Sequence, residues 1–183
     1  MLYLVVDANL SENIKRICPK DTESNPAEYT FDLVCTSCRE KHDSTVVINR
    51  FERTPLPGSR GEASFVMKCK FCGKEVSIDL NPFEDSLYND AVEDNKENIE
   101  KTQVQRKKHN LRNTQGKCFL LSLDCRGCEV TGFYPDNLTF LAELSSGKTM
   151  EFQLEDGELY DYDDDSGEEV TVTEFKSEVV KGK

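Results

Sequence analysis

Four of the eight cysteines form two Cys-x-x-Cys pairs with the spacing of a zinc site. Cys35 and Cys38 are the first pair, Cys69 and Cys72 the second, and thirty residues separate the pairs. One such turn offers two sulfurs from a single bend of backbone, and two turns complete the four thiolates that zinc binds at about 2.3 Å. A tetrathiolate leaves no open position for a catalytic water. The pattern therefore predicts one structural zinc ion; a dithiol redox pair or simple buried cysteines are the alternatives.

The residues around these pairs support the zinc interpretation. Gly73 directly follows Cys72, and a glycine there can adopt positive φ while its N–H turns toward a metal-bound sulfur, as in a zinc knuckle. Four thiolates on a dication leave a net charge of −2, which nearby cations can offset. The cations that flank the two pairs are Arg39, Lys41, Lys68, Lys70 and Lys74.

A third pair, Cys125 and Cys128, has no second Cys-x-x-Cys pair in its half of the chain to complete a four-ligand shell. Cys118 lies seven residues before Cys125, and an odd separation on one strand places the two on opposite faces. We therefore expect no second zinc. The pair is a candidate secondary thiol site, although the end of a strand is a poorer setting for a reactive thiol than a helix N-terminus.

Charge and composition narrow the function. The net charge of −12 is concentrated in residues 151–178, and an acidic chain is a poor general nucleic-acid binder. The basic stretch Arg106 to His109 is the exception, and it is interpreted as a solvated loop or as a nucleic-acid, partner or import contact. No run approaches the roughly 18 apolar residues of a membrane span. The apolar run at the N-terminus, Met1 to Val6, is too short for a secretory signal, so we expect an intracellular chain with reduced thiols.

The elements that must position the cysteines are strands. Apolar residues alternate with polar ones around Tyr29 to Leu33, Ala63 to Met67 and Val76 to Leu80, and again after residue 116. Turn signals such as Pro57-Gly58 and Asp156-Gly157 separate these runs. The pattern predicts a mostly antiparallel β protein. The polar stretch 85–115 is interpreted as a connector, with a polar helix around Val92 to Gln105 as the alternative.

The connector separates two similar segments. Tyr29 to Cys38 and Phe119 to Cys128 both read as a half-buried strand that enters a Cys-x-x-Cys turn. We interpret this as a degenerate duplication that gives two pseudo-symmetric antiparallel β halves. The predicted organisation is an N-terminal zinc-binding half (1–84), a connector (85–115) and an acidic C-terminal half without metal (116–183).

Catalytic and other metal motifs are weak. Asp161, Asp163 and Asp165 resemble the start of a calcium loop, but the glycine comes one position late and Val172 stands where the loop needs Glu. His42 and His109 have no arrangement that suggests a catalytic triad. We therefore expect a protein that is not an enzyme.

The ordered motifs resemble the eukaryotic Cys-x-x-Cys zinc-binding protein family, long regarded as being of unknown function. They are Cys35-Thr-Ser-Cys38, Gly58-Ser-Arg-Gly-Glu-Ala-Ser64, Lys68-Cys-Lys-Phe-Cys72, Asp124-Cys-Arg-Gly127 with Phe133-Tyr-Pro135, and Tyr160-Asp-Tyr-Asp163. The resemblance covers nearly the whole chain. It implies two pseudo-symmetric β halves and one zinc at Cys35, Cys38, Cys69 and Cys72. The stretch 93–112 is longer than the matching stretch in other members of that family, so no family role is assigned to it.

Two functions follow as hypotheses. The first is a non-enzymatic zinc-stabilised protein that binds a protein partner through a sheet edge or its acidic C-terminal region, Glu155 to Glu169 included. The second is thiol-dependent metal handling or redox transfer at Cys125 and Cys128. For either, we expect a monomer in the cytoplasm, and also in the nucleus, without membrane or nucleic-acid partners.

Overall fold

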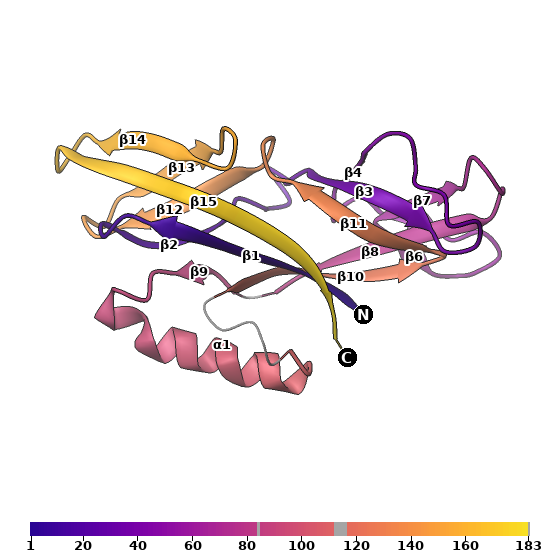
Figure 1. The fold of residues 1–183 in the computed structure, drawn as a ribbon, viewed down its shortest axis with the longest axis horizontal. Coiled ribbons are helices and arrows are strands. Elements are labelled where there is room, and N and C mark those ends of the chain that lie inside the picture. The colour runs from indigo at the N-terminus through magenta and orange to yellow at the C-terminus, as the bar shows by residue number, and fades with distance from the viewer. Residues whose placement is uncertain (84, 112–116, 183) are drawn as a thin grey trace.

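The protein is described here by a computed structural model, which describes residues 1–83, 85–111 and 117–182. It is a β protein with one α-helix among those residues (Figure 1). The strands are β1 (Leu2–Leu10), β2 (Ile14–Pro19), β3 (Tyr29–Cys35), β4 (Val46–Ile48), β5 (Thr54–Pro55), β6 (Glu62–Ala63), β7 (Phe65–Lys68), β8 (Glu75–Pro82), β9 (Leu87–Tyr88), β10 (Cys118–Arg126), β11 (Cys128–Tyr134), β12 (Thr139–Leu144), β13 (Thr149–Gln153), β14 (Leu159–Asp163) and β15 (Glu168–Lys181). The helices are a 3₁₀ turn, η1 (Glu93–Asn95), and α1 (Lys96–Lys108).

The strands form antiparallel sheets, which confirms the predicted fold class. The largest sheet has the order β14-β15-β1-β10-β8-β7. A second has the order β11-β3-β4, a third β13-β12-β2-β9, and β5 pairs with β6. The long strand β15 runs along most of the molecule, while β3, β4 and β7 lie toward one end of the long axis and β13 and β14 toward the other (Figure 1).

Each of the three larger sheets combines strands from before and after the stretch 85–115. Strand β1 pairs with β10 and β15, β2 pairs with β12, and β3 pairs with β11. The N- and C-terminal parts of the chain are thus interleaved through their hydrogen bonds. The boundaries at residues 84 and 116 fall outside the described residues, and the duplication of the halves stays a prediction.

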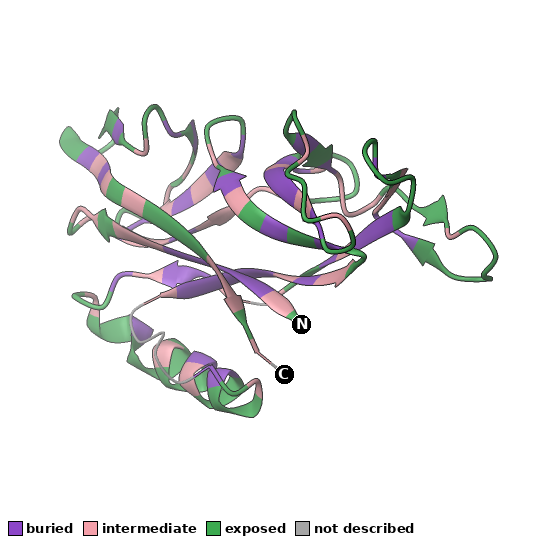
Figure 2. Ribbon diagram, turned by 45° about the vertical axis from the view of Figure 1, so that its right-hand side comes forward, coloured by how far each residue is buried: buried purple, intermediate pink, exposed green. Residues whose placement is uncertain are grey.

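The alternation read from the sequence matches the buried faces of the strands (Figure 2). Tyr29, Phe31 and Leu33 of β3 are buried, and so are Val76 and Ile78 of β8. These side chains join one core cluster that extends between the sheets. Because their burial fixes which face of each strand points inward, it also fixes how β3 presents Cys35 and how the turn before β8 presents Cys69 and Cys72.

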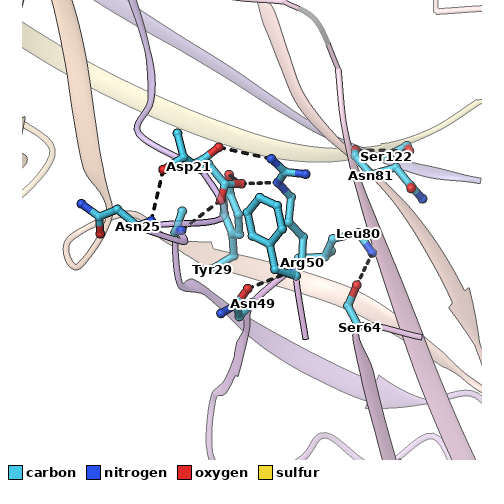
Figure 3. A network of polar contacts seen from close by, with 12 residues as sticks. Asp21, Asn25, Tyr29, Asn49, Arg50, Ser64, Leu80, Asn81 and Ser122 are labelled. Carbon is cyan, nitrogen blue, oxygen red and sulfur yellow. Dashed lines mark hydrogen bonds and ion pairs between the residues drawn. The ribbon is translucent and has the colours of Figure 1, made fainter. Parts of the chain in front are cut away.

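Polar contacts hold the strand that carries Cys35 in place (Figure 3). The carboxylate of Asp21 accepts hydrogen bonds from the Tyr29 hydroxyl (2.9 Å), the Ala27 N–H (3.0 Å) and Arg50 Nε (2.7 Å). The Asp21 side chain is 9% exposed, so a carboxylate there needs these donors. The contacts fasten the loop after β2 to both β3 and the segment after β4.

A second polar contact orders the strands around the other cysteine pair. The Ser64 hydroxyl donates to Asp79 Oδ1 (3.0 Å) and accepts the N–H of Leu80 (3.1 Å; Figure 3). Ser64 lies between β6 and β7, and Leu80 is in β8. These contacts join the residue before β7 to β8, and they thereby stabilise the β7–β8 hairpin, whose turn carries Cys69 and Cys72.

The polar stretch contains the α-helix α1 (Lys96–Lys108), which overlaps the helix named as the alternative around Val92 to Gln105. Glu93 and Asp94 precede the helix and Arg106 to Lys108 end it, an arrangement that complements the helix dipole. Residues 112–115 of the predicted connector lie outside the described residues. In the described part of the chain, no helix has both the length and the apolar character needed to cross a membrane.

Candidate metal centre

The two cysteine pairs lie in turns with the same backbone hydrogen bonds. In the first turn, the Cys35 N–H donates to the Glu40 carbonyl (3.1 Å) and the Arg39 N–H donates to the Cys35 carbonyl (2.9 Å). In the second, the Cys69 N–H donates to the Lys74 carbonyl (2.7 Å) and the Gly73 N–H to the Cys69 carbonyl (2.8 Å). Each turn folds one Cys-x-x-Cys segment back on itself and aims both of its sulfurs to one side.

The residue after each second cysteine has the same left-handed conformation. Gly73 has a φ of 74° and Arg39 a φ of 60°. The positive φ predicted at Gly73 is therefore present, although its N–H donates to the Cys69 carbonyl and not to a sulfur. A non-glycine residue, Arg39, adopts the same conformation in the first turn. A side chain with Cβ costs roughly 1–2 kcal/mol in this region, so the first turn carries strain that the second avoids.

The turns bring the four predicted ligands together. Cys35 Sγ lies 3.7 Å from Cys72 Sγ, and Cys38 Sγ lies 3.7 Å from Cys69 Sγ. All four sulfurs are within 4.8 Å of one another. A tetrahedron with zinc–sulfur bonds of about 2.3 Å has edges of about 3.8 Å, so the sulfur positions fit a zinc ion.

The cluster lies at the end of two sheets. Cys35 ends β3 of the β11-β3-β4 sheet, whereas Cys69 and Cys72 lie in the turn between β7 and β8 of the six-stranded sheet. Cys35 and Cys69 are buried, Cys38 is half-buried and Cys72 is exposed. A metal held here would therefore join two sheets at a point where one side faces solvent.

Carboxylates engage two of the cations predicted to offset the charge of a zinc site. Lys70 Nζ lies 2.6 Å from Asp43 Oδ2, and Lys41 Nζ lies 3.4 Å from Asp32 Oδ2. Both lysines are more than half exposed, so these pairs contribute little to stability. They show that part of the local positive charge is already balanced by protein carboxylates.

Without metal, the clustered thiols share protons unequally. The backbone N–H of Cys38, with that of Ser37 and the nearby thiols, lowers the pKa of Cys35 to about 6. The backbone N–H of Glu40 also lowers the pKa of Cys38. Desolvation and the other three thiols outweigh this effect, so the pKa of Cys38 is raised to about 12. Donors that stabilise the Cys35 thiolate are thus in place before a cation arrives.

The third pair, Cys125 and Cys128, forms a different kind of turn. Here the left-handed residue, Gly127 (φ 75°), lies between the cysteines, and the chain passes from β10 into β11. The thiol of Cys128 donates a hydrogen bond to Cys125, which lowers the pKa of Cys125. The same hydrogen bond, together with burial, raises the pKa of Cys128. Neither residue belongs to the four-sulfur cluster.

The sequence interpretation missed where Cys128 lies. In the pairing of β11 with β3, Cys128 stands opposite Cys35, one of the four clustered cysteines. Local sequence carries no signal for this pairing, because the register of two distant strands depends on the whole sheet. Of the remaining cysteines, Cys18 is half-buried and Cys118 fully buried, both outside the cluster.

Comparisons with known proteins agree with this picture. The model of the family described as CXXC motif containing zinc binding protein, eukaryotic, matches residues 3–180. The chain is 54% identical to UPF0587 protein YCR090C of Saccharomyces cerevisiae, over 100% of this chain and 99% of that one. It is 30% identical to the human CXXC motif containing zinc binding protein, with 93% and 92% of the two chains covered.

Solved structures share the fold. The crystal structure of C1orf123 matches with a TM-score of 0.74 and 25% identity, covering 98% of each chain. A hypothetical protein from Plasmodium falciparum matches with a TM-score of 0.73 over 98% of each chain, and at 22% identity that likeness concerns the fold alone. Sequence, fold and the gathered sulfurs lead to one conclusion. The chain belongs to the eukaryotic family of CXXC motif containing zinc binding proteins.

Proposed function

We propose that Cys35, Cys38, Cys69 and Cys72 hold one structural zinc ion in a protein whose role is binding and not catalysis. The observation that carries this proposal is the set of four sulfurs within 4.8 Å of one another, presented by two turns with matching hydrogen bonds. A bound zinc would offset half of the negative charge of the four thiolates and hold both turns. Four sulfur ligands fill its tetrahedral shell, which leaves no position for a reacting water.

The placement of the four cysteines suggests what the ion stabilises. The end of β3 and the β7–β8 turn belong to different sheets, and a metal bound to both would hold those sheets together at their edge. Structural zinc contributes roughly 10–16 kcal/mol of apparent binding free energy in small peptides, comparable with the whole stability of a domain. The end of the molecule that holds the four cysteines, called the zinc end below, therefore depends on the ion for its folded structure.

For the binding role, we propose a protein partner that contacts the acidic β14–β15 hairpin. Strand β14 is an edge of the six-stranded sheet, and Tyr160 and Tyr162 on it are 69% and 57% exposed. The carboxylate of Glu158 raises the pKa of Tyr160, which reflects the negative field there. A segment rich in Lys and Arg fits such a surface. We place the protein, as a monomer, in the cytoplasm and the nucleus.

The second hypothesis, a thiol function at Cys125 and Cys128, keeps one observation in its favour. The pKa of Cys125 is lowered by its hydrogen bond from Cys128. However, Cys128 is only 4% exposed, and a partner protein would need to reach it for dithiol exchange. The geometry therefore favours the structural zinc protein.

The zinc proposal is tested by measuring metal content. Purified wild-type protein should carry one zinc per chain, measured by inductively coupled plasma mass spectrometry. Cys35→Ser should lose it, because a hydroxyl is a poor replacement for a thiolate ligand. Cys18→Ser is the matched control, since Cys18 is half-buried and outside the cluster, and it should keep the zinc. Wild-type protein without zinc, or zinc lost only with Cys125→Ser, would refute the proposal.

A further inference from the structure

Cys128 and Cys35 form a close cross-strand pair. They are opposite each other in the antiparallel pairing of β11 with β3, and the Thr36 N–H donates to the Gly127 carbonyl (3.1 Å). A bond between the residue after Cys35 and the residue before Cys128 marks the two cysteines as a non-hydrogen-bonded pair. In such pairs the Cα atoms are about 4.5 Å apart and the side chains are at their closest.

This geometry is compatible with a disulfide. Disulfides join residues whose Cα atoms are about 4.4–6.8 Å apart, and opposite residues of an antiparallel pair project to the same face. Cys35 and Cys128 are both buried, at 6% and 4% exposure. The pairing therefore places the two backbones within the range that a disulfide spans.

The backbone around Cys128 is firmly held. Its sulfur lies 3.8 Å from the Ser77 carbonyl oxygen of β8. A Cβ at Gly127 would come within 2.7 Å of the Glu75 carbonyl, so the turn packs directly against the beginning of β8. The position of Cys128 beside Cys35 is thus set by both neighbouring strands.

A small pocket reaches both cysteines. Its volume is about 20 Å³, and its lining includes Cys35, Cys128, Cys69, Met67 and His42. A volume of roughly 10–15 Å³ already accommodates one water-sized molecule. Hydrogen peroxide is one oxygen atom larger than water, so it is the hydroperoxide that such a small pocket favours.

We propose that Cys128 is a reserve thiol that captures Cys35 in a disulfide when a hydroperoxide oxidises the zinc site. The inference rests on the proposed role of Cys35 as a zinc ligand. It assigns a specific bond to a cysteine that the four-sulfur cluster does not use.

The chemistry takes place in two balanced steps. The Cys35 thiolate attacks the O–O bond of the hydroperoxide, gains one oxygen as a sulfenic acid, and expels an alkoxide or hydroxide that takes a proton from solvent. The Cys128 thiol then attacks the Cys35 sulfur, and the hydroxyl leaves as water. The two sulfurs lose two electrons in total and the hydroperoxide gains them. Only three of the four thiolates then remain, which weakens the binding of zinc, and a dithiol reductant restores the original set.

The test uses the full-length zinc-loaded protein. It is treated with hydrogen peroxide, its free thiols are alkylated, and the disulfides are identified by peptide mass spectrometry, while a chromophoric chelator reports released zinc. The expected product is a Cys35–Cys128 disulfide that forms together with zinc release, and both changes should reverse with dithiothreitol and added zinc. Cys18→Ser, the matched control, should give the same product.

Cys128→Ser separates this inference from the zinc proposal. Before oxidation, the variant should bind zinc like the wild type, because Cys128 is not a ligand. After oxidation it cannot form the bond, and Cys35 should be found as sulfinic acid or linked to another ligand. If serine impairs folding, Cys128→Ala serves the same purpose. Disulfides confined to the four ligands, or to Cys125 and Cys128, in zinc-loaded wild type would overturn the inference while leaving the zinc proposal intact.

Discussion

At the scale of single residues, the two zinc turns differ in one respect that matters for their energetics. The residue after the second cysteine has positive φ in both, but it is glycine in one turn and arginine in the other. Among the residues that the structure describes, nothing lies within 4 Å of a Cβ built at Gly73. A side chain there would meet no neighbour, so its cost is conformational.

We therefore expect Gly73→Ala to lower the free energy of unfolding of the zinc-loaded protein by about 1 kcal/mol. Gly73→Asn should cost less, because asparagine tolerates the left-handed region better than alanine. Denaturant unfolding at fixed free zinc measures both. Equal effects of alanine and asparagine would show that backbone conformation is not the cause.

The four candidate ligands could be predicted because the chemistry of zinc requires a local spacing that the sequence displays directly. Cys128 was different. Its placement beside Cys35 results from the pairing of β3 with β11 and the turn at Gly127, and neither strand specifies the other locally. Distant register, which depends on many weak contacts across the sheet, was the missing information.

At the scale of elements, α1 shows how a polar helix is attached without an apolar stripe. Arg106 is 9% exposed; it donates to the Lys117 carbonyl and lies 3.6 Å from Asp85 Oδ2. Asp85 also accepts the N–H of Phe119 in β10 (3.0 Å), and burial raises its pKa. The helix is thus held to the sheet by a buried charged contact, which hydrophobic periodicity does not reveal. For this reason the sequence favoured a connector.

Replacing Arg106 with alanine should destabilise this attachment by about 3 kcal/mol near pH 8, because it leaves the Asp85 carboxylate buried without its cation. The loss should shrink near about pH 5. A carboxyl group whose folded-state pKa is raised binds its proton better in the folded state, so stability falls as pH rises through that pKa.

Hydrogen exchange of the α1 amides at both pH values, corrected for the intrinsic rates, measures the effect. Lys107→Ala is the matched control, because Lys107 is exposed on the same helix and should change exchange by less than about 0.5 kcal/mol. A loss that is equal at both pH values would show that Asp85 is not the group responsible.

At the scale of the whole molecule, the interleaved sheets place the two proposed functional sites far apart. The four-cysteine cluster lies where β3 and the β7–β8 turn end, and the β14–β15 hairpin lies at the other end of the long axis (Figure 1). The mostly antiparallel class was readable from alternation. The pairing of β1 with β10 and β15 was not, because any of several strands with the same period could have taken those positions.

This separation makes the proposed binding surface testable independently of the metal. A Lys- and Arg-rich peptide labelled with a fluorophore should bind the protein, and the affinity should fall with added salt, since exposed charges are screened within about 10 Å at 0.1 M. Changing both Tyr160 and Tyr162 to serine should weaken binding about ten-fold, because each exposed cation–π contact contributes about 0.5–1 kcal/mol.

Val47→Ser is the matched control: Val47 is 52% exposed on β4, toward the zinc end. Cys35→Ser should also leave the affinity unchanged if the two ends act separately. A Glu-rich peptide that binds equally well, or tyrosine variants with wild-type affinity, would remove the hairpin as the contact surface.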